Sequence, residues 1–169
     1  MRATEAFERW YAEAHPRLLA SLVLVARDRG VAEDVAAEAC ARCLDRWERR
    51  GAPDDPSAWT YRVAINDLRR RWRRSARHDE LVARLVPPAP LEVDDPAIEL
   101  WRAVAALPER ARLAVALRYL AGLTEPQVAE VMGIAVGTVG ATLTKARARL
   151  ADELRAVGLA GVDGGDGRG

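Results

Sequence analysis

The sequence predicts an all-α protein made of two small helical domains joined by an extended acidic, Pro-rich linker. Half of the 169 residues are hydrophobic and only 5% are aromatic, so we expect a core of Leu, Val and Ala packed between helices. Apolar residues recur at helical spacing over most of the chain. The stretch RLVPPAPLEVDDP interrupts this pattern with four prolines, which make a semi-rigid spacer. We therefore expect a first domain over residues 1–78, a linker over 79–96, a second domain over 97–157 and a disordered tail over 158–169.

Two helices are expected before the first turn-rich loop. The first has one apolar face and a kink or restart at Pro16, because proline fits the first turn of a helix but not its interior; the face comprises Phe7, Tyr11, Ala14, Leu18, Leu22 and Val25. The second is expected from about Val31 to Arg49. Its apolar side holds Ala36, Cys40, Cys43 and Trp47, and its opposite side holds Asp34, Glu38 and Asp45. The acidic side indicates either a protein partner or a merely solvated face.

The two cysteines form a CxxC motif on the apolar side of this second helix. A metal site of the usual kind needs four ligands, and neither a second pair nor a histidine at ligand spacing is present. Free cysteine on an apolar face behaves as a small hydrophobe. We therefore expect Cys40 and Cys43 to be buried, in preference to a redox or metal-binding role.

An arginine-rich helix is expected after the loop GAPDDP, with Ser57 as its cap. The stretch SAWTYRVAINDLRRRWRRSAR carries seven arginines, one acid, and an apolar stripe of Tyr61, Ile65, Leu68 and Trp72. Arginine can donate two hydrogen bonds to one phosphate, and aromatic rings beside it can stack on unpaired bases. A surface that only confers solubility usually mixes both signs of charge, so this face favours nucleic-acid binding over simple solvation.

The second domain ends in a predicted helix-turn-helix. We expect a helix over 97–106, another opened by Pro108 and ended by Gly122, and a third begun by a capping box of Thr124 and Gln127. After a turn at Gly133, the last helix starts near Val136, with Val139, Leu143, Ala146 and Leu150 inside. Its outer side is polar and basic, with Thr138, Thr142, Lys145 and Arg149. This arrangement is typical of a DNA-reading helix-turn-helix, a generic helical hairpin being the alternative.

The net charge of +1 conceals a separation of charge along the chain. Residues 1–78 contain 16 basic and 12 acidic residues, residues 79–100 one and six, and residues 101–157 eight and five. Two basic segments thus flank an acidic one, and nucleic acid is the natural partner of the basic segments. No stretch has the length of uncharged apolar sequence that a membrane span needs, and the N-terminus lacks a signal-peptide core. We expect a cytoplasmic protein without membrane insertion.

At this point the chain resembles a bacterial RNA polymerase sigma factor of the extracytoplasmic-function class, and within it the actinobacterial members. Three segments carry the resemblance: AEDVAAEA, WTYRVAINDLRRRWRR and LPERARLAVALRYLAGLTEPQVAEVMGIAVGTV. The first two correspond to region two of that family and the last to region four, in the family's order. The resemblance implies that core RNA polymerase and promoter DNA are the partners, and that an anti-sigma factor is a further candidate.

The resemblance also implies roles for particular residues. The acidic face would dock on the polymerase through Glu33, Asp34 and Glu38. The GAPDDP loop and the arginine helix would hold the melted non-template strand of the minus-ten element, where the family's loop captures a flipped base, and the neighbouring phosphates. These residues are Asp54, Ser57, Trp59, Arg62, Asn66, Arg69, Arg70, Arg73 and Arg74. The minus-thirty-five element would be read by Thr138, Thr142, Lys145 and Arg149.

The recognition helix departs from the family's usual pattern. It reads AVGTVGATLTKAR, with Ala135 in place of a capping Ser and Gly140 in place of a longer polar or basic residue. Both changes weaken a helix, by about 1 kcal/mol each. We therefore expect weak reading of the upstream element by this domain alone, although Gly140 also allows a closer approach of the backbone to DNA.

The sequence thus predicts a sigma factor that binds core polymerase and directs promoter-specific initiation. The alternative is a free-standing helix-turn-helix regulator that binds duplex DNA without polymerase. An acidic face beside an arginine-rich and aromatic helix favours the first, because a simple regulator needs neither. No catalytic triad, phosphate loop or metal spacing occurs, so we expect no catalytic residue, no metal and no cofactor.

Overall fold

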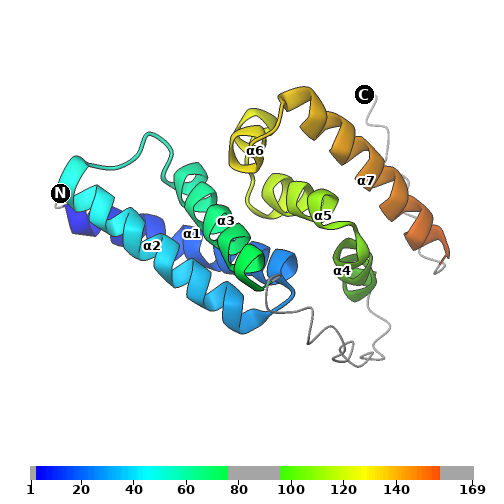
Figure 1. The fold of residues 1–169 in the computed structure, drawn as a ribbon, viewed down its shortest axis with the longest axis horizontal. Coiled ribbons are helices and arrows are strands. Elements are labelled where there is room, and N and C mark those ends of the chain that lie inside the picture. The colour runs from blue at the N-terminus through cyan, green and yellow to red at the C-terminus, as the bar shows by residue number, and fades with distance from the viewer. Residues whose placement is uncertain (1–2, 76–95, 157–169) are drawn as a thin grey trace, which may run out of the picture.

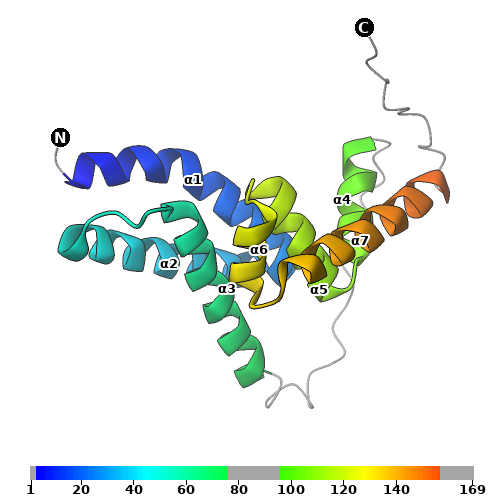
Figure 2. The ribbon, with the colours of Figure 1, turned by 90° about the horizontal axis from the view of Figure 1, so that it is seen from above.

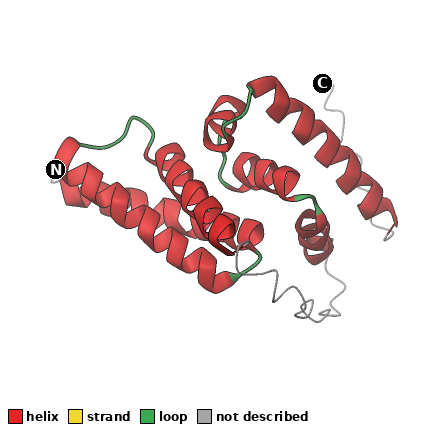
Figure 3. Cartoon of the chain, in the orientation of Figure 1, coloured by secondary structure: helices red, strands yellow, loops and turns green. Residues whose placement is uncertain are grey.

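A computed structural model describes residues 3–75 and 96–156, and every element in those two ranges is helical (Figures 1 and 3). The elements are α1 (Ala3–Ala26), α2 (Arg29–Arg50), α3 (Pro56–Ser75), α4 (Pro96–Ala106), α5 (Glu109–Val115), the π-helical segment η2 (Ala116–Leu120), α6 (Glu125–Met132) and α7 (Val136–Ala156). The all-α prediction is confirmed. The predicted linker, except for its last residue, and the predicted tail lie outside the described residues.

Helices α1, α2 and α3 form the first bundle, with α1 running beside α2 and α3 crossing them (Figures 1 and 2). Leu18, Leu22 and Val25 of α1 are buried as the spacing predicts. The helix continues through Pro16, so of the predicted kink or restart, the restart does not occur. Tyr11 was expected in the core but is 38% exposed. Its ring stacks instead on neighbours of its own helix, Phe7 and His15, with centroids 5.9 and 4.8 Å away.

The apolar side of α2 is buried as predicted, including both cysteines. Asp28 begins the helix, its carboxylate accepting from the Val31 amide at 2.9 Å. Burial, with a smaller contribution from Cys43, raises the pKa of Cys40 to about 11. Burial also raises the pKa of Cys43. Both thiols are therefore protonated at neutral pH, as expected for structural cysteines.

Helix α3 begins at Pro56, two residues earlier than a cap at Ser57 predicts, and its cap is Asp55. The Asp55 carboxylate accepts from the Ala58 amide at 2.8 Å. Proline suits the first helical position because it has no amide hydrogen to satisfy, and the capping position therefore falls on the residue before it. Tyr61, Ile65 and Leu68 are buried and Trp72 is half-buried, which confirms the predicted apolar stripe.

Helices α4 to α7 form the second half, and its turn signals act as predicted. Thr124 and Gln127 form a complete capping box at the start of α6. Gly133 ends α6 in the left-handed conformation, with φ 68° and ψ 40°. Glycine has no Cβ to oppose this conformation, so the sharp turn into α7 depends on it. The two helices of the helix-turn-helix are therefore α6 and α7.

The two halves pack against each other, which the sequence analysis did not predict. Helix α3 lies beside α6, and α1 contacts α5 and η2. A single cluster of buried apolar side chains extends from α1, α2 and α3 into α4 to α7. Arg112 of α5 connects the second half to the first. Its guanidinium donates to the carbonyls of Ala105 and Leu107 in its own half and, at 3.4 Å, to that of Val25 near the end of α1. Burial lowers the pKa of Arg112, as does the nearby charge of Arg27.

Among the described helices, none alone is long and apolar enough to cross a membrane. The bent pair α6 and α7 meets that test by length and composition only, across an angle of 102°.

Candidate nucleic-acid interface

The arginines of α3 fall into three groups. Arg70, Arg73 and Arg74 are exposed, and they make no ion pair with any described residue. Arg62 forms an ion pair with Glu130 of α6, and Arg69 donates to the Met132 carbonyl at 3.0 Å. Arg71, which was not among the predicted site residues, is paired with Asp34 and Asp67. Arg70, Arg73 and Arg74 thus carry positive charge that no described residue pairs, whereas Arg62, Arg69 and Arg71 are already engaged.

The loop before α3 borders a pocket of about 260 Å³. Its walls include Asp54 of the loop, Trp59 and Arg62 of α3, and Arg46 of α2. The guanidinium of Arg46 stacks over the Trp59 ring at 5.7 Å from its centroid. Its Nε is buried and makes no hydrogen bond to any described residue. A planar aromatic wall beside an arginine is an environment that suits an unpaired base.

Ser57 and Asn66, both predicted to touch DNA, are not among the residues that line this pocket. The Ser57 hydroxyl accepts a hydrogen bond from the Trp10 indole at 3.1 Å, so it helps to join α1 to α3. Asn66 is exposed further along α3. The sequence analysis missed Arg46, because its neighbour Trp59 is thirteen positions away on another helix.

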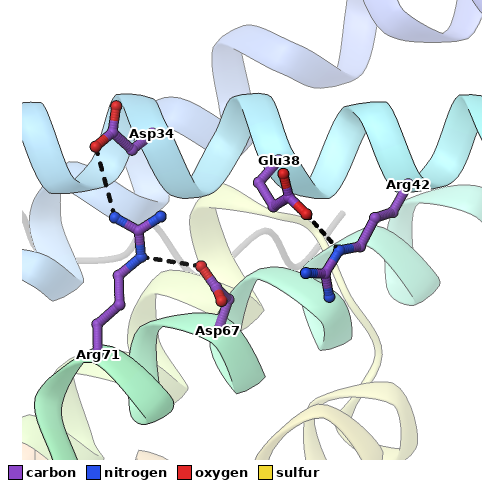
Figure 4. Close-up of polar contacts among 5 residues, drawn as sticks. All are labelled: Asp34, Glu38, Arg42, Asp67 and Arg71. Carbon is purple, nitrogen blue, oxygen red and sulfur yellow. Dashed lines mark hydrogen bonds and ion pairs between the residues drawn. The ribbon is translucent and has the colours of Figure 1, made fainter. Parts of the chain in front are cut away.

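The predicted acidic face of α2 is exposed, but each of its carboxylates has an arginine partner. Figure 4 shows the partners of Asp34 and Glu38. Asp34 pairs with Arg71 of α3 at 3.5 Å, and Arg71 also donates to Asp67 at 3.0 Å. Within α2, Glu33 pairs with Arg29 at 2.8 Å and Glu38 with Arg42 at 2.7 Å. Solvent-exposed pairs of this kind contribute about 0–1 kcal/mol, so a partner protein can exchange them at small cost.

The outer face of α7 carries the four residues predicted to read duplex DNA. Lys145 and Arg149 are exposed, and Thr138 and Thr142 are half-buried. The Thr142 hydroxyl donates to the Thr138 carbonyl at 2.7 Å, which leaves its oxygen free to accept but not to donate. A shallow apolar pocket of about 270 Å³ separates this face from α5 and is bordered by Arg110, a cation the sequence analysis did not single out.

The two atypical residues of the recognition helix are Ala135, just before α7, and Gly140, within α7. Ala135 precedes the first residue of α7, and its carbonyl accepts from the Thr138 amide at 2.9 Å, but its side chain can accept nothing. A Cβ at Gly140 would lie 3.4 Å from the Glu125 carboxylate, which is ordinary contact. The packing of α6 against α7 therefore does not require glycine at this position.

Residues 10–78 match Sigma-70 region 2, and residues 97–150 match Sigma-70, region 4. The chain is also 31% identical over 155 residues to the RNA polymerase sigma-E factor of Streptomyces coelicolor, covering 88% of this chain and 85% of that protein. The chain belongs to the sigma-70 family of RNA polymerase sigma factors, in its extracytoplasmic-function class.

One further sequence relative and one solved structure resemble this chain over most of its length. An uncharacterized protein of Rhizobium meliloti is 30% identical over 158 residues, which is 82% of this chain but only 36% of that protein. The sigma factor RpoE from Bartonella quintana, solved in complex with the anti-sigma factor NepR, matches the fold with a TM-score of 0.74. That match covers 89% of this chain and 98% of RpoE at 20% identity. The region 2 match falls on α1 to α3 and the region 4 match on α4 to α7, and these helices are called region 2 and region 4 below.

Proposed function

We propose that this sigma factor binds core RNA polymerase and directs promoter-specific initiation of transcription, and that it catalyses no reaction itself. The observation that carries the proposal is the presence, in one chain, of two different nucleic-acid surfaces. Region 2 offers an arginine-rich helix beside an aromatic pocket, which suits a melted strand. Region 4 offers a helix-turn-helix with a basic outer face, which suits the major groove.

The alternative, a free-standing regulator of duplex DNA, accounts for α6 and α7 alone. It leaves the pocket beside Trp59 and the free arginines at the end of α3 without a role. The structure favours a protein that contacts both duplex and single-stranded DNA, which is the requirement of promoter opening.

We assign polymerase docking to the exposed face of α2 that carries Glu33, Asp34 and Glu38. Supporting this assignment, all three carboxylates are exposed, and among the described residues their ion-pair partners are exposed or half-exposed arginines. We assign the minus-ten strand to the pocket beside Trp59 and to α3, adding Arg46 to the residues predicted from the sequence. The minus-thirty-five element is assigned to Thr138, Thr142, Lys145 and Arg149.

The proposed site of action is the cytoplasm, where core polymerase and chromosomal DNA are found. An anti-sigma protein is a further proposed partner, because the structurally similar RpoE was solved with one. Reconstitution with core polymerase tests the main proposal. Promoter-dependent transcripts are expected when the protein is added, and their absence on a library of upstream fragments from its own genome, together with sequence-specific binding to duplex DNA, would instead support the regulator.

A further inference from the structure

Helix α6 begins with Glu125, whose carboxylate is not engaged by any described residue. The side chain is half-buried and makes neither a hydrogen bond nor an ion pair within the described ranges. The capping box of Thr124 and Gln127, together with Pro126, fixes the backbone on both sides of it. An acid in the first turn is favoured by the helix dipole, which holds it there without a side-chain partner. Both oxygens of the carboxylate are therefore available to accept hydrogen bonds from a ligand.

The Glu125 carboxylate lies next to α7 at Gly140. A Cβ added at Gly140 would lie 3.4 Å from its Oε2 atom, an ordinary contact, so packing does not require glycine there. The consequence of glycine is that nothing at this position covers the carboxylate or pairs with it. Gly140 lies in the second turn of α7, and the N-terminal residues of a recognition helix are those that meet base edges. The acid of α6 is thus close to the part of α7 that meets DNA.

The face of α7 around Gly140 has no charge of its own. Four residues share it at the i, i+3, i+4, i+7 spacing, and all but Gly140 are exposed: Gly137, Gly140, Ala141 and Thr144. The Thr144 hydroxyl donates to the Gly140 carbonyl at 2.9 Å, so it can accept a further bond but not donate one. Lys145 follows Ala141 by four positions, so this face adjoins the cations assigned to DNA. The charge beside it is supplied by Glu125.

A carboxylate discriminates between bases in the major groove because it only accepts hydrogen bonds. Cytosine presents the N4 amine there, which is a donor. Guanine presents two acceptors, and thymine presents an acceptor and a methyl group, so neither can donate to a carboxylate. Adenine presents an amine, but beside the N7 acceptor, which repels a negative oxygen. Cytosine is therefore the base that fits this group.

We propose that Glu125 determines base specificity at the minus-thirty-five element, with its carboxylate accepting a hydrogen bond from the N4 amine of a cytosine. The same negative charge repels phosphates and base acceptors, so the residue rejects other sequences as well as binding the preferred one. This inference rests on the proposed function, since it takes α7 to be the helix that enters the major groove of the upstream element.

The test is transcription by core polymerase with the full chain, from templates that share one minus-ten element and vary each upstream base in turn. At one upstream position, cytosine should give about tenfold more transcript than the other bases, since a good base contact is worth about that factor. Glu125→Ala should reduce this preference to about twofold or less and raise transcription from templates without the cytosine. Glu125→Gln should move the preference to adenine, because glutamine pairs with N6 and N7 of adenine.

Two further variants separate base reading from a role in stability. Glu153→Gln makes the same charge change at an exposed position near the C-terminal end of α7 and should keep the preference for cytosine. Gly140→Lys places an ammonium beside the carboxylate and should remove that preference. If Glu125→Gln keeps the parent's preference at every upstream position, the carboxylate only stabilises the start of α6 and the proposal is wrong. Absence of transcripts from every template would instead refute the proposed function, and this inference with it.

Discussion

The free end of α3 leads to a quantitative prediction about salt. Arg70, Arg73 and Arg74 are exposed and form no ion pair with a described residue, so each can neutralise one phosphate. Binding of single strands loses about 0.7 in the slope of log affinity against log salt for each such contact, so three contacts contribute about 2. Replacing all three by Ala should therefore reduce the slope by about 2. Between about 50 and 200 mM salt, the variant should lose about 20-fold less affinity than the parent.

The assay is anisotropy of a labelled single strand, titrated at several salt concentrations and with several sequences. A matched control is Arg29, Arg42 and Arg49 to Ala, which removes the same charge from exposed positions of α2 where each arginine already has an acidic partner. The control should keep nearly the whole slope. An equal change of slope in both variants would show that net charge, and not contact along α3, determines binding. A variant whose preference among sequences also changes would show that these arginines read bases.

Three further predictions concern other parts of the protein. Asp34→Lys with Glu38→Lys should weaken binding to core polymerase at least tenfold in a pull-down titration while the circular dichroism spectrum stays unchanged; unchanged binding would remove α2 from the interface. Ala135→Ser with Gly140→Lys in the full chain should raise the free energy of unfolding by about 1–2 kcal/mol and tighten binding to upstream duplex DNA, as followed by thermal melting and anisotropy; a lower melting temperature would show that glycine is needed there after all. Burial raises the pKa of Cys40 in the folded protein to about 11, so the stability that the protonated thiol contributes is complete below the pKa of the unfolded thiol and is lost as pH rises through about 11. The free energy of unfolding of Cys40→Ala should therefore fall less steeply than that of the parent between about pH 9 and 11. An identical fall in both proteins would contradict the burial argument.

The interiors of the single helices were predictable because helical periodicity records which side of a helix is covered. The stripes of α3 and α7 and the capping box of α6 were all found as expected. Tyr11 was placed wrongly because periodicity identifies the apolar face of a helix but not which positions on that face a neighbouring helix covers; Phe7 and Leu18 on the same face are buried. Ser57 was placed wrongly as a cap because Pro56, as the first helical residue, moves the capping position back to Asp55.

The sequence could not predict the contact between the two regions. One of its acceptors is a backbone carbonyl, that of Met132, and every residue has one. The pair of Arg62 and Glu130 joins residues 68 positions apart with no recognisable spacing. The same holds for Arg46 over Trp59. Contacts between elements are decided by how the elements pack, so they become visible only in the structure.

Arg71 connects the two surfaces to which we assign different macromolecules. Its guanidinium reaches Asp34 on the proposed polymerase face and Asp67 on α3, which carries the proposed DNA surface (Figure 4). A cation of the polymerase that takes Asp34 leaves Arg71 with one carboxylate fewer, which raises the positive potential along α3. By thermodynamic reciprocity, DNA that draws Arg71 away from Asp34 leaves the Asp34 carboxylate available to a cation of the polymerase. Under these assignments, polymerase binding strengthens promoter binding, and promoter binding strengthens polymerase binding, through the Arg71 side chain and without a change of fold.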